Sequence, residues 1–413
     1  MSVVGARPNF MKTAPIIAAI REFNERAAKT SRPGNESRNG RPLQHILVHT
    51  GQHYDESMSD QFFIDLNMPK PDIHLGVGGG SHASQTAEIL RKFEEVLVRE
   101  RPDVLVVVGD VNSTVACALA AAKLPSDGCG RSRPLVVHVE SGLRSFDRAM
   151  PEEHNRVMTD HLADILFVTE PSGIRNLKRE GIPASRVHFV GNTMIDTLVA
   201  FQEKAESSSV LRELGLRAGA SSNGAKPITS PYALLTLHRP ANVDDRDAFA
   251  QILEGLSELS SRMPVIFPAH PRTAKRVEEF GLAHLFTGGK SGAPDRAENQ
   301  NPGCGIRMVP PRGYLDFVCL MKNARVVVTD SGGIQEETTC LRVPCVTIRE
   351  NTERPVTITS GTNVLAGVTA AGIRKAIRKQ LSRRRHGAMP KKWDGKSAHR
   401  IVKILATAPG RAS

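Results

Sequence analysis

The feature that most constrains the fold is a regular alternation of short apolar runs with amphipathic stretches. Runs rich in Val, Ile and Leu that end in Gly, Asp, Thr, Glu or Asn are HILVHTG (45–51), DVLVVVGD (103–110), LVVHVESG (135–142), ILFVTE (165–170) and VHFVGN (187–192). Continuous apolar runs of this kind are typical of parallel strands covered on both faces. Segments of helical character lie between them, namely KTAPIIAAIREFNERA (12–27), ASQTAEILRKFEEVLVRE (83–100) and NSTVACALAAAKL (112–124). The pattern predicts an α/β fold with a doubly wound parallel sheet.

The same alternation begins again after the polar stretch LRAGASSNGAKPITSP (216–231). The second series of apolar runs is YALLTLHR (232–239), PVIFPAHP (264–271), IRMVPP (306–311), ARVVVTDSGG (324–333) and PCVTIRE (344–350). Since 413 residues exceed what one core usually organises, we predict two Rossmann-like doubly wound domains, residues 1–196 and 197–389. We expect them to face a central cleft lined by the carboxyl ends of the strands, where ligands bind.

Composition narrows the classes of function. The formal charge of +12 is compatible with nucleic-acid binding, but with 4% aromatic residues the chain offers no platform for stacking bases. The charge better suits solubility and the attraction of anionic small molecules. No apolar run approaches the roughly 20 residues that cross a bilayer, and the N-terminus lacks a signal-peptide pattern, so we expect a cytoplasmic protein without membrane insertion.

Cysteine usage and three polar stretches lead to further expectations. The six cysteines form no CxxC pair and no zinc-ligand spacing with histidines, so we expect reduced thiols and no metal site. Residues 29–42, 124–134 and 287–304 are polar and contain Gly or Pro, which is typical of surface insertions.

The stretch TDSGGIQEETT (329–339) follows an apolar run and opens a predicted helix. Two adjacent glycines, Gly332 and Gly333, allow a sharp turn and bring backbone N–H groups close to a ligand. The positive end of the helix dipole points toward the same N–H groups, so we expect an anionic ligand there. From this stretch alone, an ordinary capped strand-to-helix turn is an equally good interpretation.

Polar residues at other strand ends indicate acid–base chemistry. Asp110 ends one buried strand, Glu140 ends the next, and Glu152 follows at a helix start. Each could simply cap a helix or pair with its dipole, but three carboxylates on one rim favour a catalytic role. In the second half His238 and His270 follow strands and are flanked by Arg or Pro. Together these residues predict that the second domain binds a phosphorylated ligand and that the first domain supplies the acid–base catalysts.

A set of motifs in a fixed order resembles one enzyme family. The motifs are GARPNFMKTAPI (5–16), HTGQHYD (49–55), GDVNST (109–114), HVESGLRS (138–145), PEEHNR (151–156), GNTMID (191–196), LHRP (237–240), PAHPRT (268–273), DSGGIQEE (330–337) and RENTERPVTITSGTN (349–363). From about residue 3 to 367 the chain resembles the non-hydrolysing UDP-N-acetylglucosamine 2-epimerases. The resemblance implies a glycosyltransferase B-like architecture, with the C-terminal helix, about residues 390–413, returning to the first domain.

The resemblance also implies an activity. Members interconvert UDP-GlcNAc and UDP-ManNAc by eliminating UDP to give 2-acetamidoglucal and adding it back, which supplies ManNAc-type sugars for cell-surface polysaccharide. A UDP-sugar substrate, no cofactor and a homodimer are implied as well. Asp110, Glu140 and Glu152 match the family's catalytic carboxylates and His238 its functional histidine, near the leaving diphosphate. The sequence leaves open which carboxylate takes the proton.

Residues for the nucleotide are implied by the same match. They are Arg7 and Lys12 in the first domain, and His270, Ser331, Gly332, Gly333, Glu337 and Arg349 in the second. The glycine turn would receive the diphosphate, and Glu337 would accept hydrogen bonds from the ribose hydroxyls.

Three motifs depart from the usual family pattern, since GARPN replaces GTRPE, HVES replaces HVEA, and TERPVT replaces TERPE. These neighbours could shape the sugar pocket, so a further modified UDP-HexNAc stays open as substrate. A retaining glycosyltransferase, a hydrolysing 2-epimerase and a nucleotide-sugar sensor are the alternatives.

Overall fold

The chain of this computed structural model divides into two compact units, which are described separately. The first unit comprises Met1–Ala200 with Lys391–Ser413, and the second comprises Phe201–Pro390. The division falls inside helix α7 (Thr193–Glu206), four residues after the predicted boundary between residues 196 and 197. The described residues are 1–30, 42–52, 63–125, 133–217, 229–287, 304–382 and 387–407. Most of the three expected insertions, and residues 218–228 of the polar stretch, lie outside them.

The first unit is built on a parallel sheet whose strand order is β3-β2-β1-β4-β5-β6-β7. Its strands are β1 Ser2–Val4, β2 Leu47–His49, β3 Ile73–His74, β4 Val104–Val108, β5 Leu135–Ser141, β6 Ile165–Val168 and β7 Val187–Phe189. The chain winds outward in one direction from β1 and in the other from β4. In open α/β sheets such a switch point opens a crevice at the carboxyl ends of the strands.

Helices cover both faces of this sheet. They are α1 Arg7–Thr30, α3 His82–Glu100, α4 Asn112–Lys123, α5 Pro151–Leu162, α6 Pro171–Arg179, α7, and α17 Ser397–Thr407. Leu105 and Val107 of β4 belong to a core cluster with α3 and α4, whereas Val106 and Val108 belong to one with α1 and α17. Because successive strand residues point to opposite faces, this double burial explains the unbroken apolar run.

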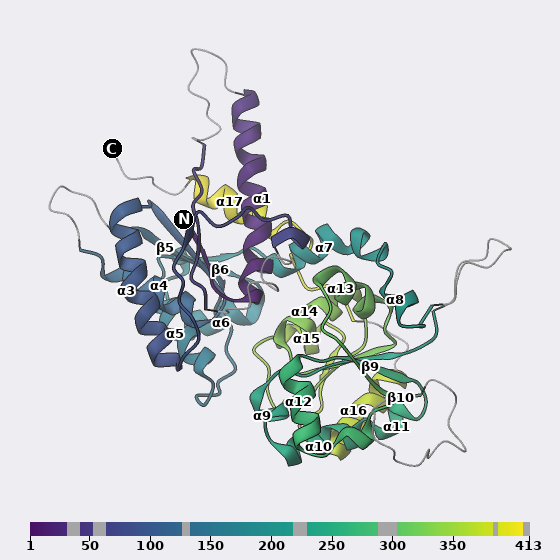
Figure 1. The fold of residues 1–413 in the computed structure, drawn as a ribbon. Helices are drawn as coiled ribbons and strands as arrows, with labels where there is room; N and C mark the ends of the chain where they lie inside the picture. The colour runs from purple at the N-terminus through teal and green to yellow at the C-terminus, as the bar shows by residue number, and fades with distance from the viewer. Residues whose placement is uncertain are drawn as a thin grey trace. The chain divides into compact units, whose positions relative to one another are not determined.

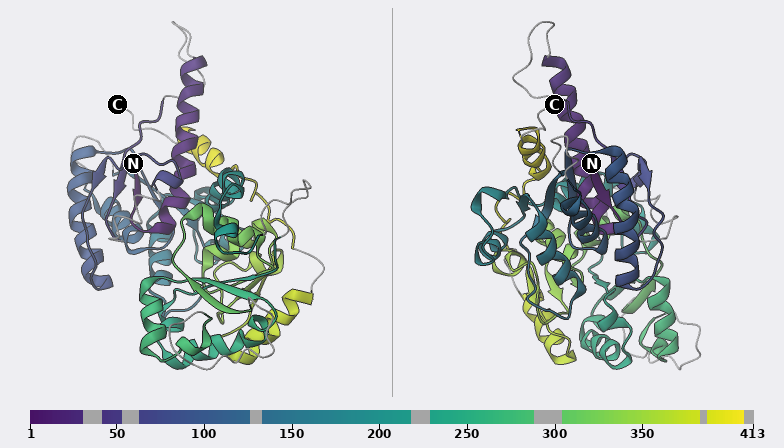
Figure 2. Two further views of the ribbon diagram at one scale, coloured as in Figure 1. Left: turned by 45° about the vertical axis from the view of Figure 1, so that its right-hand side comes forward. Right: turned by 90° about the vertical axis from the view of Figure 1, so that its left-hand side faces the viewer.

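The C-terminal segment of the chain belongs to the first unit. Figures 1 and 2 show α17 (yellow) beside α1 (purple), where Ile401 and Val402 share a core cluster with Ile16. The indole of Trp393 is buried and donates to the Thr169 carbonyl at 3.0 Å. Asp196 accepts a hydrogen bond of 2.6 Å from the Ala398 N–H at the start of α17.

The second unit repeats the plan of the first with a parallel sheet ordered β10-β9-β8-β11-β12-β13. Its strands are β8 Ala233–Thr236, β9 Pro264–Pro268, β10 Gly305–Val309, β11 Val326–Thr329, β12 Cys345–Thr347 and β13 Asn363–Leu365. The winding direction changes between β8 and β11, so the second switch point lies at Thr236 and Thr329. Their hydroxyls are 2.7 Å apart.

Helices again cover this sheet. They are α8 Val210–Glu213, α9 Pro240–Val243, α10 Arg246–Gly255, α11 Ser257–Ser260, α12 Pro271–Glu279, α13 Tyr314–Asn323, α14 Gly332–Leu341, α15 Val356–Thr359 and α16 Ala370–Ser382. One core cluster joins Val265 and Val328 of the sheet to Phe249 of α10 and Ile373 of α16. The predicted fold class is confirmed, because each unit holds a doubly wound parallel sheet. None of the helices in the described ranges is both long and apolar enough to cross a bilayer.

Candidate functional site

Asp110 follows β4 at the first switch point and is held by Arg156 of α5. The guanidinium places Nη2 at 2.9 Å and Nε at 3.0 Å from Oδ2 of Asp110. Arg156 in turn contacts the buried Glu153, which also accepts from the N–H groups of Ser145 and Phe146. Neither Arg156 nor Glu153 was predicted as a site residue, because an Arg three residues after a Glu on a helix is typically a surface ion pair.

Glu140 lies near the end of β5, where the backbone is unusual. Its φ is +76°, and the register between β5 and β6 shifts between Val139 and Ser141. Left-handed backbone is costly for a non-glycine residue, and bulges at sheet ends often re-aim a functional side chain. The carboxylate is buried and forms an ion pair with the equally buried Lys12 of α1. The structure thus places Lys12 with Glu140 inside the first unit.

Glu152 is half-buried in the first turn of α5. Among the described residues it has neither a hydrogen-bond nor an ion-pair partner, in contrast to Asp110 and Glu140. The helix that carries it approaches Asp110, because Asn155 donates to the Asp110 carbonyl at 2.9 Å. The first unit therefore brings the ends of β4 and β5 and the start of α5 together.

A buried charge network lies beneath these carboxylates. His138 Nε2 is 2.8 Å from the Gly109 carbonyl and Nδ1 is 2.7 Å from Asp160. Both partners are hydrogen-bond acceptors, so each can receive an N–H of the ring. Burial acts to raise the pKa of Asp160, but the charges and hydrogen bonds of His138 and Arg144 lower it below its ordinary value. The network fixes the carbonyl that precedes Asp110.

The second unit presents a histidine and a buried aspartate at its switch point. His238 follows β8, and its Nδ1 is 2.6 Å from Oδ1 of Asp330, which follows β11. Asp330 is fully buried, whereas the His238 side chain is 62% exposed. Burial acts to raise the pKa of Asp330, but His238 and hydrogen bonds from Arg239 and Asn242 lower it. Asp330 was not among the predicted site residues, because an Asp before Ser-Gly-Gly is typical of a turn.

The N-terminus of α14 lies directly beyond Asp330. Its N-cap is Ser331, and no side chain within the described ranges caps the helix. Gly332 and Gly333 were expected to form a sharp turn, but both lie in the first helical turn. Gly332 is required for a different reason, since a Cβ there would come within 2.5 Å of Arg354 Nη1. Uncapped N–H groups beside a guanidinium suit a phosphate.

The guanidinium of Arg354 is placed by buried carboxylates. Its Nε is 2.9 Å from Glu336, and its Nη1 is 3.6 Å from Glu353. Glu353 also pairs with Arg349 at 2.8 Å. Arg349 is therefore a buried ion-pair partner in this network, where it also donates to Asn351 at 3.1 Å.

Glu337 is a buried acid in the same helix. Burial, with a smaller effect from the charge of Glu336, raises the pKa of Glu337 to about 8. The hydroxyl of Tyr314 donates to its Oε1 across 3.4 Å, which offsets only part of this shift. A carboxyl in this state can accept hydrogen bonds from a ligand hydroxyl and gain its charge as it does so.

The remaining predicted residues lie at helix starts. His270 is the exposed N-cap of α12, and its Nδ1 accepts from the Arg272 N–H at 3.2 Å. Arg7 is the first residue of α1, and its side chain lies outside the described part of the chain. Ser331, Gly332 and His238 thus share the carboxyl edge of the second sheet with His270.

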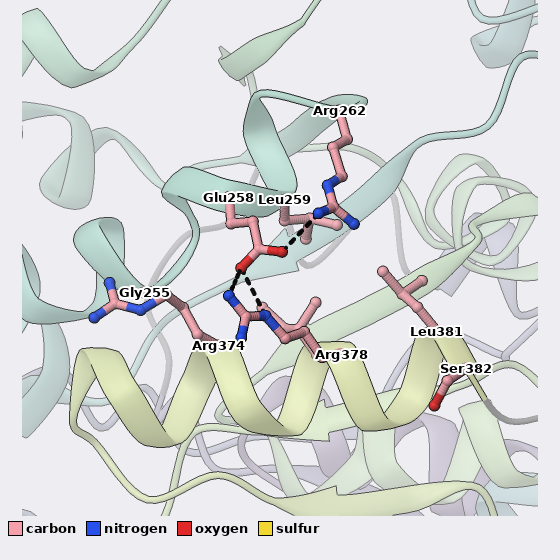
Figure 3. Close-up of a pocket in the computed structure, with 9 residues that line it drawn as sticks. Gly255, Glu258, Leu259, Arg262, Arg374, Arg378, Leu381 and Ser382 are labelled. Atoms are coloured by element: carbon pink, nitrogen blue, oxygen red, sulfur yellow. Dashed lines mark hydrogen bonds and ion pairs between the residues drawn. The ribbon is translucent and has the colours of Figure 1, made fainter.

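A surface pocket of about 250 Å³ lies elsewhere on the second unit (Figure 3). Glu258 sits between Arg262 and Arg378 on its wall, at 2.9 and 2.5 Å. Arg262 precedes β9, so the pocket adjoins the amino edge of the sheet. None of the predicted site residues lines it.

Comparison with known proteins identifies the family. A family model described as UDP-N-acetylglucosamine 2-epimerase matches residues 35–406. The chain belongs to this family. A UDP-N-acetylglucosamine 2-epimerase of Methanocaldococcus jannaschii is 40% identical, over 98% of this chain and 97% of that protein. A UDP-2,3-diacetamido-2,3-dideoxy-D-glucuronate 2-epimerase of Pseudomonas aeruginosa is 36% identical, over 98% of this chain and 99% of that protein.

A solved member of the epimerase family shares the fold. The crystal structure of the M. jannaschii UDP-GlcNAc 2-epimerase in complex with UDP-GlcNAc and UDP matches with a TM-score of 0.80 and 38% identity. The match covers 98% of each chain. The resemblance read from the motifs is thereby confirmed at the level of the family.

Proposed function

We propose that this protein interconverts UDP-N-acetylglucosamine and UDP-N-acetylmannosamine without releasing the free sugar. The observation that supports the proposal is that, in a chain of this family, the three carboxylates differ in whether a cation pairs with them. Asp110 and Glu140 are held by the cations Arg156 and Lys12, while Glu152 has no such partner among the described residues. Paired and unpaired carboxylates in one unit provide both an oriented base and a group that can exchange protons with solvent.

The proposed chemistry begins with removal of the proton on carbon 2 by one carboxylate. The electron pair of that C–H bond forms the double bond between carbons 1 and 2, and the bond from carbon 1 to the diphosphate oxygen breaks. The products of this step are 2-acetamidoglucal and UDP. UDP then adds back to carbon 1 while a second acid delivers a proton to the other face of carbon 2.

The second unit would hold the nucleotide during these steps. In the proposal, the first N–H groups of α14 and the guanidinium of Arg354 bind the diphosphate, and Glu337 binds the ribose hydroxyls. Ser331, Gly332, Gly333, His270 and Arg349 shape this site, and His238 donates to the departing diphosphate. We further propose that Arg7 contributes from the first unit, that the protein acts as a homodimer, and that the product serves cell-surface polysaccharide synthesis.

Product analysis tests the proposal. Incubation with UDP-GlcNAc should yield an equilibrium mixture with UDP-ManNAc, and incubation with UDP-ManNAc should yield the same mixture. Free ManNAc with stoichiometric UDP would instead indicate a hydrolysing 2-epimerase. Consumption of substrate only when a sugar acceptor is added would indicate a glycosyltransferase.

A second candidate substrate comes from the P. aeruginosa relative, whose name specifies a diacetamido-dideoxy-glucuronate. That sugar carries an additional acetamido group at carbon 3 and a carboxylate at carbon 6. Presenting both UDP-sugars separately and comparing kcat/KM assigns the substrate. A preference for the glucuronate derivative of tenfold or more, about 1.4 kcal/mol in transition-state binding, would replace UDP-GlcNAc in the proposal.

A further inference from the structure

We propose that Asp330 is a positioning residue for the reaction, which holds His238 with hydrogen on Nδ1 and directs Nε2 toward the substrate. The inference rests on the proposed function for its kinetic consequences. The contact itself is independent of that function and can be measured in the free protein.

The contacts of Asp330 leave its carboxylate little freedom. Oδ2 accepts from the Arg239 N–H at 2.9 Å and from Nδ2 of Asn242 at 3.0 Å. The His238 N–H lies 3.1 Å from the same oxygen, and Oδ1 receives the His238 ring. Because Asp330 is fully buried at the switch point, the backbone and the ring of His238 are both fixed against one rigid group.

These contacts decide which ring nitrogen faces solvent. An ionised carboxylate only accepts hydrogen bonds, so Nδ1 of His238 must donate. Nε2 has no partner among the described residues, and the side chain is 62% exposed. In the neutral ring Nε2 therefore carries the lone pair, and in the protonated ring its N–H is available to a diphosphate oxygen.

Other charges near His238 are already paired with one another. Arg239, the next residue, is 3.6 Å from Glu353, and Glu353 in turn pairs with Arg349. The only carboxylate in hydrogen-bond contact with the ring within the described ranges is Asp330. The orientation of His238 is thus assigned to this single residue.

His270 provides a contrast within the same unit. Its Nδ1 accepts a hydrogen bond from the Arg272 N–H, so in the neutral ring the hydrogen must lie on Nε2. Two histidines that follow neighbouring strands therefore present opposite tautomers. His270 is a built-in reference for measuring His238.

The first experiment measures these tautomers by NMR in the full-length protein labelled with ¹⁵N-histidine. Spectra recorded up to about pH 9, well above the ordinary pKa of a histidine ring, capture the neutral rings, and His238→Asn and His270→Asn assign the signals. We expect His238 to carry hydrogen on Nδ1 and His270 on Nε2, and we expect Asp330→Asn to change His238 alone. If Nδ1 of the neutral His238 ring carries no hydrogen in the wild-type protein, the proposal is overturned without any variant.

The second experiment is a double-mutant cycle with UDP-GlcNAc as substrate. Asp330→Asn should lower kcat at least about tenfold, because the amide can donate to Nδ1 and favour the wrong tautomer, as in the Asp–His pair of serine proteases. The KM should change much less. In a His238→Asn background the same substitution should have no further effect, because residues acting as a unit are not additive.

A purely structural role for Asp330 predicts a different result. Asp330→Asn would then lower activity equally in both backgrounds, and that outcome would overturn the proposal. Asp245→Asn is the matched control, since Asp245 caps α10 by accepting from the Ala248 N–H at 2.8 Å and Asn caps as well. If the wild-type protein epimerises nothing, the proposed function falls, while the NMR measurement still decides the role of Asp330.

Discussion

The two switch points of this protein share one topology and differ in chemistry. In the first unit, Asp110 and Glu140 are compensated internally by Arg156 and Lys12. In the second unit, the corresponding place holds the exposed His238, paired with the buried Asp330, and an uncapped helix N-terminus. The first site is rich in carboxylates that can exchange protons, and the second in N–H donors that can hold an anion.

The difference shows how two units of the same fold can carry different functional groups, one with acid–base groups and the other with anion-binding groups. Strand order places a switch point at the carboxyl edge of each sheet, but the side chains after β4, β5, β8 and β11 decide what each switch point can bind. Buried cations beside the carboxylates of the first unit cost desolvation energy, which only their pairing offsets. We therefore expect substitutions of the first-unit carboxylates to affect turnover, and substitutions at the start of α14 and at Glu337 in the second unit to affect UDP binding.

The largest expected effect is on turnover in the first unit. Asp110→Asn should lower kcat at least about a hundredfold, the usual scale for a lost general acid or base, while UDP affinity stays within about twofold. Glu152→Gln should act in the same way. Chromatographic conversion assays and calorimetric UDP titration measure the two quantities.

The control for this prediction is Asp147→Asn, an outlying turn residue whose Oδ1 accepts from the Ala149 N–H at 3.0 Å. It should leave both quantities unchanged. Loss of UDP binding in Asp110→Asn, or full turnover in both first-unit variants, would break the proposed division of labour.

The next effect concerns the phosphate end of the second site. Gly332→Ala should weaken UDP binding about tenfold, or about 1.4 kcal/mol. The new Cβ would lie only 2.5 Å from Nη1 of Arg354 and would therefore displace the guanidinium. Calorimetric titration of the variant with UDP measures the loss.

Gly79→Ala is the control, since a Cβ there meets nothing within 4 Å. Wild-type UDP affinity in Gly332→Ala would mean that the diphosphate does not bind at the start of α14.

A smaller effect should appear in the pH dependence of UDP binding. Glu337 has a pKa of about 8, so near neutral pH it is protonated in the free protein. Ribose hydroxyls that donate to it stabilise the ionised form, so binding lowers its pKa and releases a proton. UDP affinity should therefore rise as the pH rises toward about 8 and level off above it.

UDP itself titrates in this range, so Glu337→Gln provides the matched comparison. The variant should keep the part of the pH dependence that belongs to UDP and lose the remainder. Calorimetry in buffers of different ionisation enthalpy counts the protons directly. An identical proton release in wild type and variant would remove Glu337 from the ribose site.

The smallest effects concern the bonds that close each switch point. Asn9 accepts from the N–H groups of Gly5 and Ala6 and donates to the Val108 carbonyl at 2.9 Å. Asn9→Ala should lower the free energy of unfolding by about 2 kcal/mol, whereas Thr236→Val, which loses the contact with the Thr329 hydroxyl, should lower it by about 1 kcal/mol. Urea unfolding of each variant measures the values, and the reverse order would show that the second switch point is the more tightly closed.

Much of this organisation could be predicted from the sequence, because long apolar runs and strand-end residues carry it. The strands β1, β3 and β13 were not predicted, because their surrounding sequences do not stand out as apolar runs, unlike those around the equally short β2, β7 and β12. The positive φ of Glu140 depends on pairing with β6. Asp330, Arg156 and Arg354 were not predicted as site residues because their importance lies in which distant residue each contacts, and local patterns do not contain that information.

The measurement that most directly tests proton exchange at carbon 2 is epimerisation in heavy water. If a carboxylate of the first unit removes the hydrogen and a solvent-exchanged group replaces it, UDP-ManNAc formed from UDP-GlcNAc should carry deuterium at carbon 2. Mass spectrometry and proton NMR of the purified product detect it. UDP-ManNAc formed without deuterium at carbon 2 would contradict the proposed acid–base roles of Asp110, Glu140 and Glu152.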